Sequence, residues 1–461
     1  MLSEKKGIIL YELNEVPRAL IEEYIQLRPK STISEILNNS NLFDTFTHDK
    51  GELHPWTTWP TIHRGVNNDL HNIQFINQEL KINNRYPPIW DILQKNKISV
   101  GVYGSLQSYP PLKSQFIKFF LPDTFSPDSD AFPEELELFQ RFNLAICKDN
   151  KAVSSPIKAI LYLDFLNLLA KNLISLKSCF KTIKHITSEI YSSKYKSRRS
   201  LLQPVLNFDL YINHLVKYQP KFSTYFTNHV AGMMHRYWIY LFNEKGNKDI
   251  FNKNSLIKSM DIADSQLKRL VQISKNNNYN IIITSSMGQK LRENISPDLD
   301  ICLISLSKLC KSIGINPINY RELPAMQPDI CIKCSNKKAL DSLRHNIKKI
   351  KDSKDNNILT ERYEPIDLNL NISIKMTSNV YEFQKLKVDG LEKELKDTGF
   401  RIVNRDPGTA YHCPQGILFT YGDEVINDMF KNLNNPIIDT TRIAPIILKY
   451  FGVKLPSYMK S

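Results

Sequence analysis

The sequence predicts an α/β protein, a doubly wound three-layer α/β/α fold with a mainly parallel central sheet and two insertions. Three observations support this prediction. Short apolar runs with strand character alternate with stretches of helical periodicity. With 461 residues, 42% of them hydrophobic, the chain is long enough to bury a large core. Two long stretches interrupt the alternation, and we interpret these stretches as insertions.

Four of the apolar runs are expected to be core strands, because each is followed by a helical pattern. They cover Gly7 to Tyr11, Ser99 to Tyr103, Ser223 to Thr227 and Asn280 to Thr284. Strands that alternate with helices favour a parallel sheet that is covered on both faces. Ligands bind at the carboxyl ends of such strands, so candidate site residues are expected on the loops that follow these runs.

The interruptions divide the chain into a discontinuous core and two insertions. Residues 112–220 contain the Pro/Asp/Ser-rich stretch LPDTFSPDSDAFPEELELF and helical patterns such as IKAILYLDFLNLLAKNLISL, which predict a mainly helical cap. Residues 303–404 combine a Cys-x-x-Cys strand with a lysine-rich helix and are predicted to be a second, α+β insertion. The core is then assigned to residues 1–111, 221–302 and 405–461.

Charge and cysteine content narrow the class of protein. Lysine and arginine total 61 against 47 acidic residues, and the net charge of +14 favours anionic partners such as phosphate esters or nucleotides. Many lysines lie in Asn/Ile-rich stretches, so specific nucleic-acid binding is not indicated. Seven irregularly spaced cysteines do not form the disulfide framework of a small secreted domain. Without an apolar run of ~18 residues or a signal-peptide pattern in MLSEKKGIILYEL, we expect a cytoplasmic protein with no transmembrane segment.

Two candidate positions follow from the residues themselves. Glu12 falls where the first strand is expected to end, and a carboxylate there can point into a cleft and bind a divalent ion. A solvated glutamate, or one paired with a lysine, is the alternative. Thr57 and Thr58 in HPWTTWPTIHRG precede a helical pattern, and their hydroxyl groups could cap that helix.

Four segments in chain order carry a resemblance to a known family. They are GIILYELNEVP, PWTTWPTIHRGVNNDLHNI, PPIWDILQKNKISVGVYGSLQSYPP and IIDTTRIAPIILKYFGVKLPSYM. Together they resemble the alkaline phosphatase superfamily, nearest its type I phosphodiesterase/nucleotide pyrophosphatase branch. The resemblance spans both ends and the middle of the chain and omits the insertions. It implies phosphoryl transfer through a Thr, Ser or Cys at a helix N-terminus, next to two metal ions that are usually zinc.

The resemblance implies a nucleophile within one short segment. Thr58-Trp59-Pro60 is the best match to the family's Thr-Phe-Pro pattern, which makes Thr58 the candidate nucleophile with Thr57 beside it. A register counted back from Gly65 without a gap places Pro55 at that position instead.

The resemblance also implies a reduced metal site. His235 and His412 match two histidines that bind one metal, and His229 could supply a further ligand because Ala231 stands in the family's aspartate column. Where the family has Ser-Asp-His-Gly, this chain has Ser285-Ser286-Met287-Gly288, whose hydroxyl and thioether are poor zinc ligands. We therefore expect one divalent ion, which the resemblance implies is zinc. Glu12 is expected to act as a general base or as a weak second ligand.

These features favour a divergent metal-dependent phosphoric-ester hydrolase, similar to a phosphodiesterase or nucleotide pyrophosphatase, that acts on a small anionic phosphoester or nucleotide-like substrate. Two alternatives stay open. One is a catalytically degenerate binding protein that retains the alkaline phosphatase fold. The other is a transferase that moves a phosphorylated headgroup in surface glycan or lipid modification.

Overall fold

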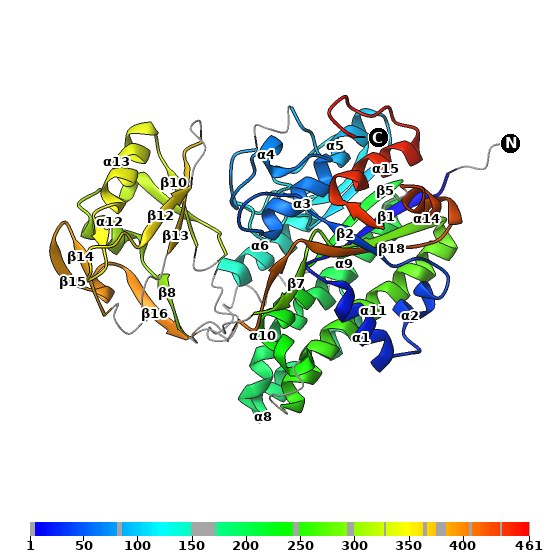
Figure 1. Ribbon diagram of the computed structural model, residues 1–461, viewed down its shortest axis with the longest axis horizontal. Helices are drawn as coiled ribbons and strands as arrows, with labels where there is room; N and C mark the ends of the chain where they lie inside the picture. Colours follow the sequence, from blue (N-terminus) through cyan, green and yellow to red (C-terminus); the bar gives the residue numbers. More distant parts are fainter. Residues whose placement is uncertain are drawn as a thin grey trace.

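The computed structural model describes residues 5–80, 85–148, 171, 173–242, 249–292, 299–326, 329–362, 367–374, 384–404, 408–433 and 436–460. An eight-stranded sheet forms the centre of the molecule (Figure 1). From edge to edge its strands are β19 (Ile437–Asp439), β2 (Phe43–Phe46), β18 (Gln415–Tyr421), β6 (Tyr279–Thr284), β1 (Gly7–Leu13), β5 (Phe222–Thr227), β3 (Val100–Tyr103) and β4 (Ile117–Leu121).

The pairing of these strands confirms the predicted mainly parallel sheet. The five strands from β6 to β4 run parallel, while β18 is antiparallel to both β6 and β2. All four predicted strands lie side by side in the middle of the sheet, in the order β6, β1, β5, β3. The carboxyl ends of these parallel strands therefore meet at one edge, where a site can assemble.

Helices cover both faces of the sheet, which confirms the three-layer arrangement. Alternate side chains of β1 enter two different cores: Ile9 and Tyr11 pack on one face, and Ile8 and Leu10 pack on the other. Figure 1 shows one helical layer below the sheet and one above it. The lower layer contains α1 (Arg18–Leu27), α2 (Thr32–Leu37), α9 (Gln203–Tyr218), α10 (His229–Phe242) and α11 (Ile250–Asn277). The upper layer contains α3 (Pro55–Arg64), α4 (Asn68–His71), α5 (Ile89–Lys95) and α15 (Ile443–Phe451), with the 3-10 helix η6 (Thr440–Arg442).

The stretch predicted as a helical cap, residues 112–220, begins with a strand of the main sheet. Its first element, β4, hydrogen-bonds to β3 at the edge of the main sheet, because the apolar residues Ile117 to Leu121 form a buried strand between polar loops. The helical elements that follow are α6 (Glu135–Lys148), α8 (Leu176–Tyr191), the 3-10 helix η2 (Ser193–Leu201) and α9. The helical pattern predicted over 157–176 lies largely outside the described residues.

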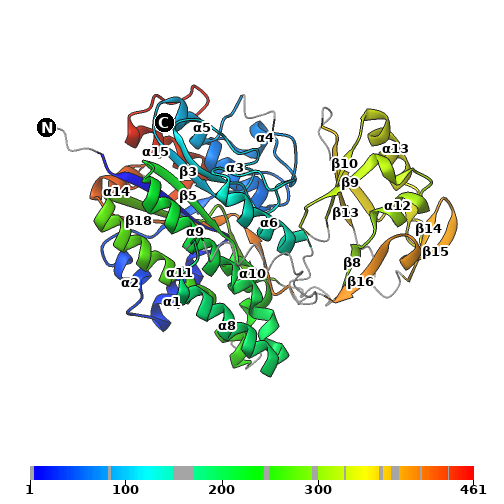
Figure 2. The same cartoon turned by 180° about the vertical axis from the view of Figure 1, so that it is seen from behind.

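The stretch predicted as a second insertion forms a lobe beside the main sheet with its own hydrophobic core (Figure 2). A four-stranded sheet, β12-β13-β10-β9, and a three-stranded sheet, β11-β14-β15, build it, and the antiparallel pair of β8 and β16 lies where the chain enters and leaves it. Its elements are β8 (Leu299–Leu303), α12 (Leu306–Ser312), η3 (Pro317–Asn319), β9 (Tyr320–Leu323), β10 (Ile330–Cys334), α13 (Lys337–Ile347), β11 (Ile350–Lys351), β12 (Leu359–Arg362), β13 (Asn369–Ile374), β14 (Lys385–Val388), β15 (Leu391–Glu394), η5 (Leu395–Asp397) and β16 (Phe400–Asn404).

A two-stranded ribbon joins this lobe to the core. It pairs β7 (Gly288–Leu291), which follows β6 closely, with β17 (Ala410–Cys413), which leads into β18. The last described helix before the C-terminal elements is α14 (Glu424–Lys431). Among the residues that the structure describes, none of the helices combines the length and the apolar character needed to cross a bilayer.

Candidate metal centre

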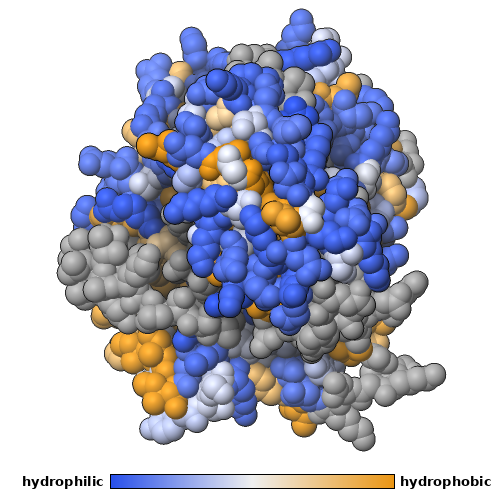
Figure 3. All heavy atoms as spheres, turned by 90° about the vertical axis from the view of Figure 1, so that its left-hand side faces the viewer, coloured by the Kyte–Doolittle hydropathy of each residue, from blue (hydrophilic) through white to orange (hydrophobic). Residues whose placement is uncertain are grey.

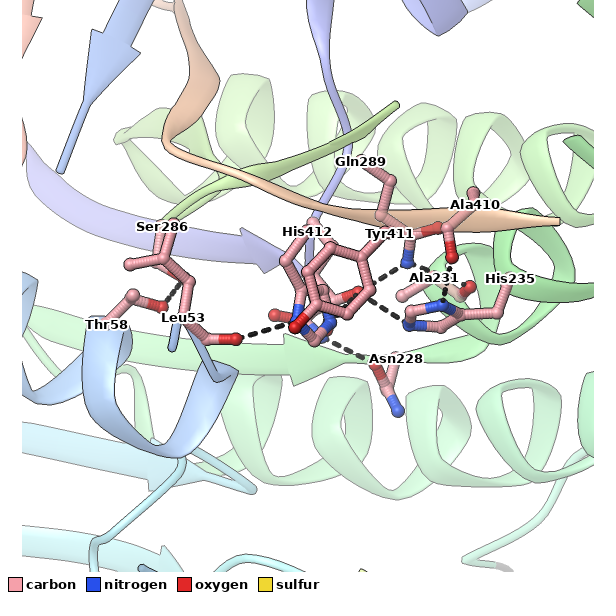
Figure 4. Close-up of polar contacts among 12 residues, drawn as sticks. Leu53, Thr58, Asn228, Ala231, His235, Ser286, Gln289, Ala410, Tyr411 and His412 are labelled. Carbon is pink, nitrogen blue, oxygen red and sulfur yellow. Dashed lines mark hydrogen bonds and ion pairs between the residues drawn. The ribbon is translucent and has the colours of Figure 1, made fainter. Parts of the chain in front are cut away.

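Three side chains from distant parts of the chain meet at the carboxyl end of β1. They are Glu15, which follows β1, His235 on α10 and His412 on β17, and one ligand atom of each lies within 4.8 Å of the others. Glu15 Oε2 is 3.1 Å from His235 Nε2 and 3.3 Å from His412 Nε2. Figure 4 shows the two imidazoles turned toward one another. The two histidines predicted as ligands are thus brought together, with a carboxylate that the sequence did not single out.

The backbone after β1 turns the Glu15 carboxylate into this position. Glu15 has a φ of 60°, in the left-handed region that residues with a side chain rarely adopt. Its side chain is only 3% exposed. Unfavourable backbone conformations of this kind persist where the surrounding structure enforces them, and they cluster at functional sites.

Both imidazoles are oriented by backbone carbonyl groups. His412 Nδ1 donates to the Leu53 carbonyl at 2.7 Å, and His235 Nδ1 donates to the Ala410 carbonyl at 3.2 Å. A proton on Nδ1 leaves the neutral ring with a lone pair on Nε2, the atom that faces Glu15. Metal-binding histidines commonly donate their other ring N–H to an acceptor in this way, which fixes the orientation of the ring. Two lone pairs and a carboxylate facing one another require a cation between them, either a metal ion or a proton.

The charges of the three groups are strongly coupled. Burial alone would raise the pKa of Glu15, but the two histidines outweigh this effect and hold its pKa well below the usual range. Burial alone would lower the pKa of His412, but the Glu15 charge and hydrogen bonds to Glu15 and Leu53 raise it above the usual value. The cluster therefore stabilises positive charge beside a buried carboxylate, as a cation site must.

Amide side chains hold Glu15 in place. Asn14 Nδ2 donates to Glu15 Oε1 at 2.8 Å and to Asn228 Oδ1 at 2.6 Å, and the Trp59 indole donates to Asn14 Oδ1 at 2.8 Å. Gln289 on β7 donates to Glu15 Oε2. Asn14 and Gln289 are buried amide residues beside the ends of strands, and a polar residue next to an apolar strand is the one sequence signal that could have found them.

Glu12 lies outside this cluster. His63 Nε2 on α3 is 2.8 Å from Glu12 Oε1, and both side chains are completely buried. The His63 ring packs against the rings of Trp59 and Trp90. Glu12 is still within β1 and points toward α3, whereas the chain has already turned at Glu15. The sequence predicted Glu12 as a metal ligand or general base, and its pairing with His63 was not foreseen.

His229 is also engaged elsewhere. Its Nδ1 bonds to Thr227 Oγ1 at 2.7 Å, and its Nε2 donates to the Ser259 carbonyl at 2.9 Å. Burial lowers the pKa of His229 to about 4, so the ring is neutral. With both nitrogens already hydrogen-bonded, His229 has no atom left for an ion, and we omit it from the ligand set.

Thr58 lies beside Ser286, which is part of the segment Ser285-Ser286-Met287-Gly288. Its hydroxyl is hydrogen-bonded to the Ser286 hydroxyl at 2.7 Å, and both side chains are fully buried. His54 is the N-cap of α3, and the Thr57 and Thr58 amides both donate to its carbonyl, so neither threonine caps the helix. In Figure 4 the Thr58–Ser286 pair lies on one side of His412, and His235 lies on the other.

Polar side chains of the core and of the second lobe meet beside His412. Glu52 accepts a hydrogen bond from the Tyr411 hydroxyl at 2.7 Å and lies 3.8 Å from Arg362 of β12. Its pKa is lowered to about 2, chiefly by His54, whose Nε2 lies 3.7 Å from Glu52 Oε2. The His54 ring packs edge-on against that of His412. The second lobe therefore contributes a cation to the rim of the site.

The fold and these contacts define an α/β protein with a candidate metal centre at the carboxyl ends of parallel strands. No family model and no curated protein matches the chain. Solved structures similar to it include a murine ectonucleotide pyrophosphatase/phosphodiesterase 5, with 10% identity, a TM-score of 0.40 and 99% and 98% of the two chains covered. A phosphonoacetate hydrolase from Sinorhizobium meliloti 1021 in complex with phosphonoacetate has 10% identity, a TM-score of 0.43 and coverage of 97% and 96%.

A third similar structure is a TAB5 alkaline phosphatase variant with bound Mg, at 12% identity, a TM-score of 0.40 and coverage of 98% of this chain and 100% of that one. The identities and TM-scores of all three similarities are low, so the chemistry proposed below rests on the residues of this chain.

Proposed function

We propose that the protein is a phosphoric-ester hydrolase that uses one divalent metal ion, held by Glu15, His235 and His412. The observation that carries this proposal is the convergence of two imidazole Nε2 atoms on one buried carboxylate, with each Nδ1 tied to a backbone carbonyl. Two imidazoles and one carboxylate are a ligand set that suits zinc and leaves a fourth position open. The net charge of +14 supports an anionic substrate.

A divalent ion at this site would act as a Lewis acid on a phosphoryl oxygen. The protein's own groups do the rest. Asn14 and Gln289 keep the Glu15 carboxylate fixed, and the carbonyl groups of Leu53 and Ala410 keep both rings in the ligating tautomer. Preorganisation of this kind avoids the cost of rearranging ligands during the reaction.

Thr58, with Thr57 beside it, stays our candidate nucleophile. Thr58 lies in the first turn of α3, where backbone N–H groups and the helix dipole favour a negatively charged phosphoryl group. Its hydroxyl is bonded to Ser286 and must exchange that partner for a substrate before it can attack. Thr58→Ala should remove turnover and leave the metal bound, whereas Thr57→Ala should change the rate much less. Equal rates for Thr58→Ala and the unaltered protein would exclude Thr58 as nucleophile.

A second candidate function is binding without hydrolysis. It is favoured by the state of the Thr58 hydroxyl, which is fully buried, and by Glu12, which is paired with His63 and so is not available to a second ion. A protein of this kind would bind a phosphorylated ligand through one metal and would not turn it over.

Metal content and hydrolysis distinguish these functions. The protein would be stripped with a chelator, reloaded with Zn²⁺, Mn²⁺ or Mg²⁺, and assayed with bis-p-nitrophenyl phosphate and with the monoester. We expect one ion per chain, with both the ion and the activity lost in His235→Ala and in His412→Ala. His345→Ala is the matched control, because His345 is an exposed histidine of the second lobe. An ion without activity would favour the binding function, and a chain that binds no divalent ion would overturn the metal centre.

A further inference from the structure

Helix α8 (Leu176–Tyr191) exposes apolar side chains along one face. The exposed residues follow one another at intervals of one to four positions, and intervals of three and four place side chains on the same side of a helix. They are Leu176 at 77% exposure, Phe180 at 71%, Ile183 at 57%, Ile186 at 45%, Ile190 at 79% and Tyr191 at 90%. We call these six residues the α8 stripe. Figure 1 places α8 at the lower end of the molecule, and Figure 3 shows exposed hydrophobic groups at that end.

The opposite face of α8 is polar, and it is this face that contacts the protein. Ser178 is buried, and the side chains of His185 and Glu189 are only 10% and 9% exposed. His185 Nε2 lies 3.0 Å from Glu189, and Arg199 of η2 donates to both Glu189 oxygens at 2.8 and 2.7 Å. A surface helix normally turns its apolar face inward. In α8 this orientation is reversed, and the described residues of the protein leave the stripe exposed.

Cations border the α8 stripe. Lys177, Lys181 and Lys184 recur at four- and three-residue intervals, which places them along one flank of the stripe, and all three are exposed. Lys258 of α11 is close enough for its pKa to be lowered, first by burial and then by the charges of Arg198, Lys184 and Lys181. The only acidic residue of α8, Glu189, is turned inward and bonded to Arg199. The exposed side of α8 therefore combines apolar side chains with a row of cations that has no acidic residue of the helix to offset it.

A cavity lies next to this row of lysines. It has a volume of about 260 Å³ between α8, α9 and α11, and its walls include Lys177, Lys181 and Arg269 together with Ser175 and Ser178. Arg269 is partly neutralised, because its Nη1 is 2.6 Å from Asp209. A volume of about 10–15 Å³ on this measure is enough for one water molecule, so the cavity has room for a phosphate-bearing group.

We propose that α8 docks the protein on an anionic lipid surface, with the α8 stripe buried in the interface and the flanking lysines in contact with lipid phosphates. An apolar stripe bordered by lysines is the pattern of helices that lie in the plane of a membrane interface. Lysine side chains near an anionic lipid surface are attracted to its phosphates, and salt weakens this attraction. A second copy of the chain would cover the stripe but would bring a second row of lysines and no exposed acid from α8. An anionic lipid surface would cover the apolar α8 stripe and would also neutralise the flanking lysines.

Sedimentation with lipid vesicles tests this proposal. Vesicles of phosphatidylcholine alone would be compared with vesicles that also contain phosphatidylglycerol, at low and at high salt. We expect binding to the anionic vesicles at least tenfold stronger than to the neutral ones, weakened by salt. The triple variant Phe180→Ser/Ile183→Ser/Ile190→Ser should lose binding, and Lys177→Gln/Lys181→Gln/Lys184→Gln should weaken it severalfold. The altered side chains are exposed, so circular dichroism should show an unchanged fold.

The matched control removes exposed apolar side chains elsewhere. Ile318→Ser/Leu391→Ser lies in the second lobe, where these side chains are 83% and 69% exposed, and should bind vesicles like the unaltered protein. Three outcomes would overturn the proposal. They are no binding to any vesicle, a dimer abolished by the triple variant without vesicle binding, and a large fall in melting temperature of the triple variant, which would mean that the chain itself covers the stripe.

Discussion

Glu15 Oε2 lies 3.1 Å from His235 Nε2, although Glu15 lies in the turn after β1 and His235 lies on helix α10. His412 reaches the same carboxylate oxygen from β17. This meeting of one carboxylate and two oriented imidazoles is the basis of the proposed metal centre, and it separates Glu15 from the nearby Glu12.

Two glutamine substitutions test which glutamate binds the metal. Glu15→Gln keeps the shape of the side chain and removes its charge, so we expect the affinity for Zn²⁺ to fall at least tenfold, as is typical when a metal site is disturbed. Glu12→Gln should leave the metal stoichiometry unchanged and lower stability instead, because it weakens a fully buried pair with His63. Isothermal titration with Zn²⁺ measures the first effect, and urea unfolding measures the second. The opposite pattern would assign the metal to Glu12.

Gln289 is expected to position Glu15. It is 1% exposed, and its amide donates to Glu15 Oε2. Gln289→Leu removes this donor at nearly constant volume, so we expect a 10–100-fold loss of Zn²⁺ affinity with the same number of sites. Gln78→Leu is a comparison at another buried glutamine, one that bonds to backbone groups away from the cluster, and it should retain normal affinity. Equal affinities in both variants would contradict a positioning role for Gln289.

His229 is expected to make stability depend on pH. Its pKa is lowered by burial to about 4 in the folded protein, against roughly 6.5 in an unfolded chain. The contribution of His229 to the free energy of unfolding is therefore fully present above about pH 6.5. It is lost as the pH falls toward 4, because the unfolded chain takes up a proton that the folded protein excludes. Linkage predicts a loss of about 2 kcal/mol between pH 7.5 and pH 5 from this group.

Urea unfolding of the His229→Gln variant checks this expectation. The variant should be less stable at pH 7.5 and should lose about 2 kcal/mol less than the unaltered protein on going to pH 5. It should also bind Zn²⁺ normally, because both nitrogens of His229 are engaged elsewhere. Loss of Zn²⁺ binding with unchanged stability would restore His229 to the ligand set.

Gly288 allows the ribbon that bears His412 to pack closely on the core. A Cβ at this position would lie 2.2 Å from the Gln415 carbonyl oxygen and 3.0 Å from Pro17 Cβ. Gly288→Ala should therefore cost about 1–3 kcal/mol of stability and weaken metal binding by moving β17. Gly232 is the control, because a Cβ there meets no atom within 4 Å on helix α10. Gly232→Ala should stabilise the protein by roughly 0.5–1 kcal/mol, which thermal unfolding would show.

Arg362 of the second lobe places a positive charge at the rim of the proposed metal centre. It lies 3.8 Å from Glu52, next to Tyr411 and His54. If the substrate is an anionic phosphoester, Arg362→Ala should raise KM severalfold with a smaller change in kcat, because the side chain is at the rim and does not contact the metal ligands. Arg321→Ala, at an exposed arginine of the same lobe, should leave both parameters unchanged. Steady-state kinetics with bis-p-nitrophenyl phosphate would reveal the difference.

Much of the fold could be predicted from local sequence patterns. The apolar runs that became β1, β3, β5 and β6 are continuous and buried, so their period and composition identified them without tertiary information. Strand β4 was missed because its short run lies between polar loops, and only pairing with β3 makes it part of the sheet.

The sequence by itself determined the α/β class and the central strands, because periodicity and residue type are local properties of the chain. The two histidines were predicted from short motifs that resemble those of a known family. The tertiary structure decided that Glu15 lies beside both histidines, that Glu12 is buried against His63, and that His229 is fully hydrogen-bonded. The left-handed backbone at Glu15 and the packing of β17 on β7 bring these side chains together. Such contacts depend on how distant segments cross in space, which the spacing of residues along the chain does not encode.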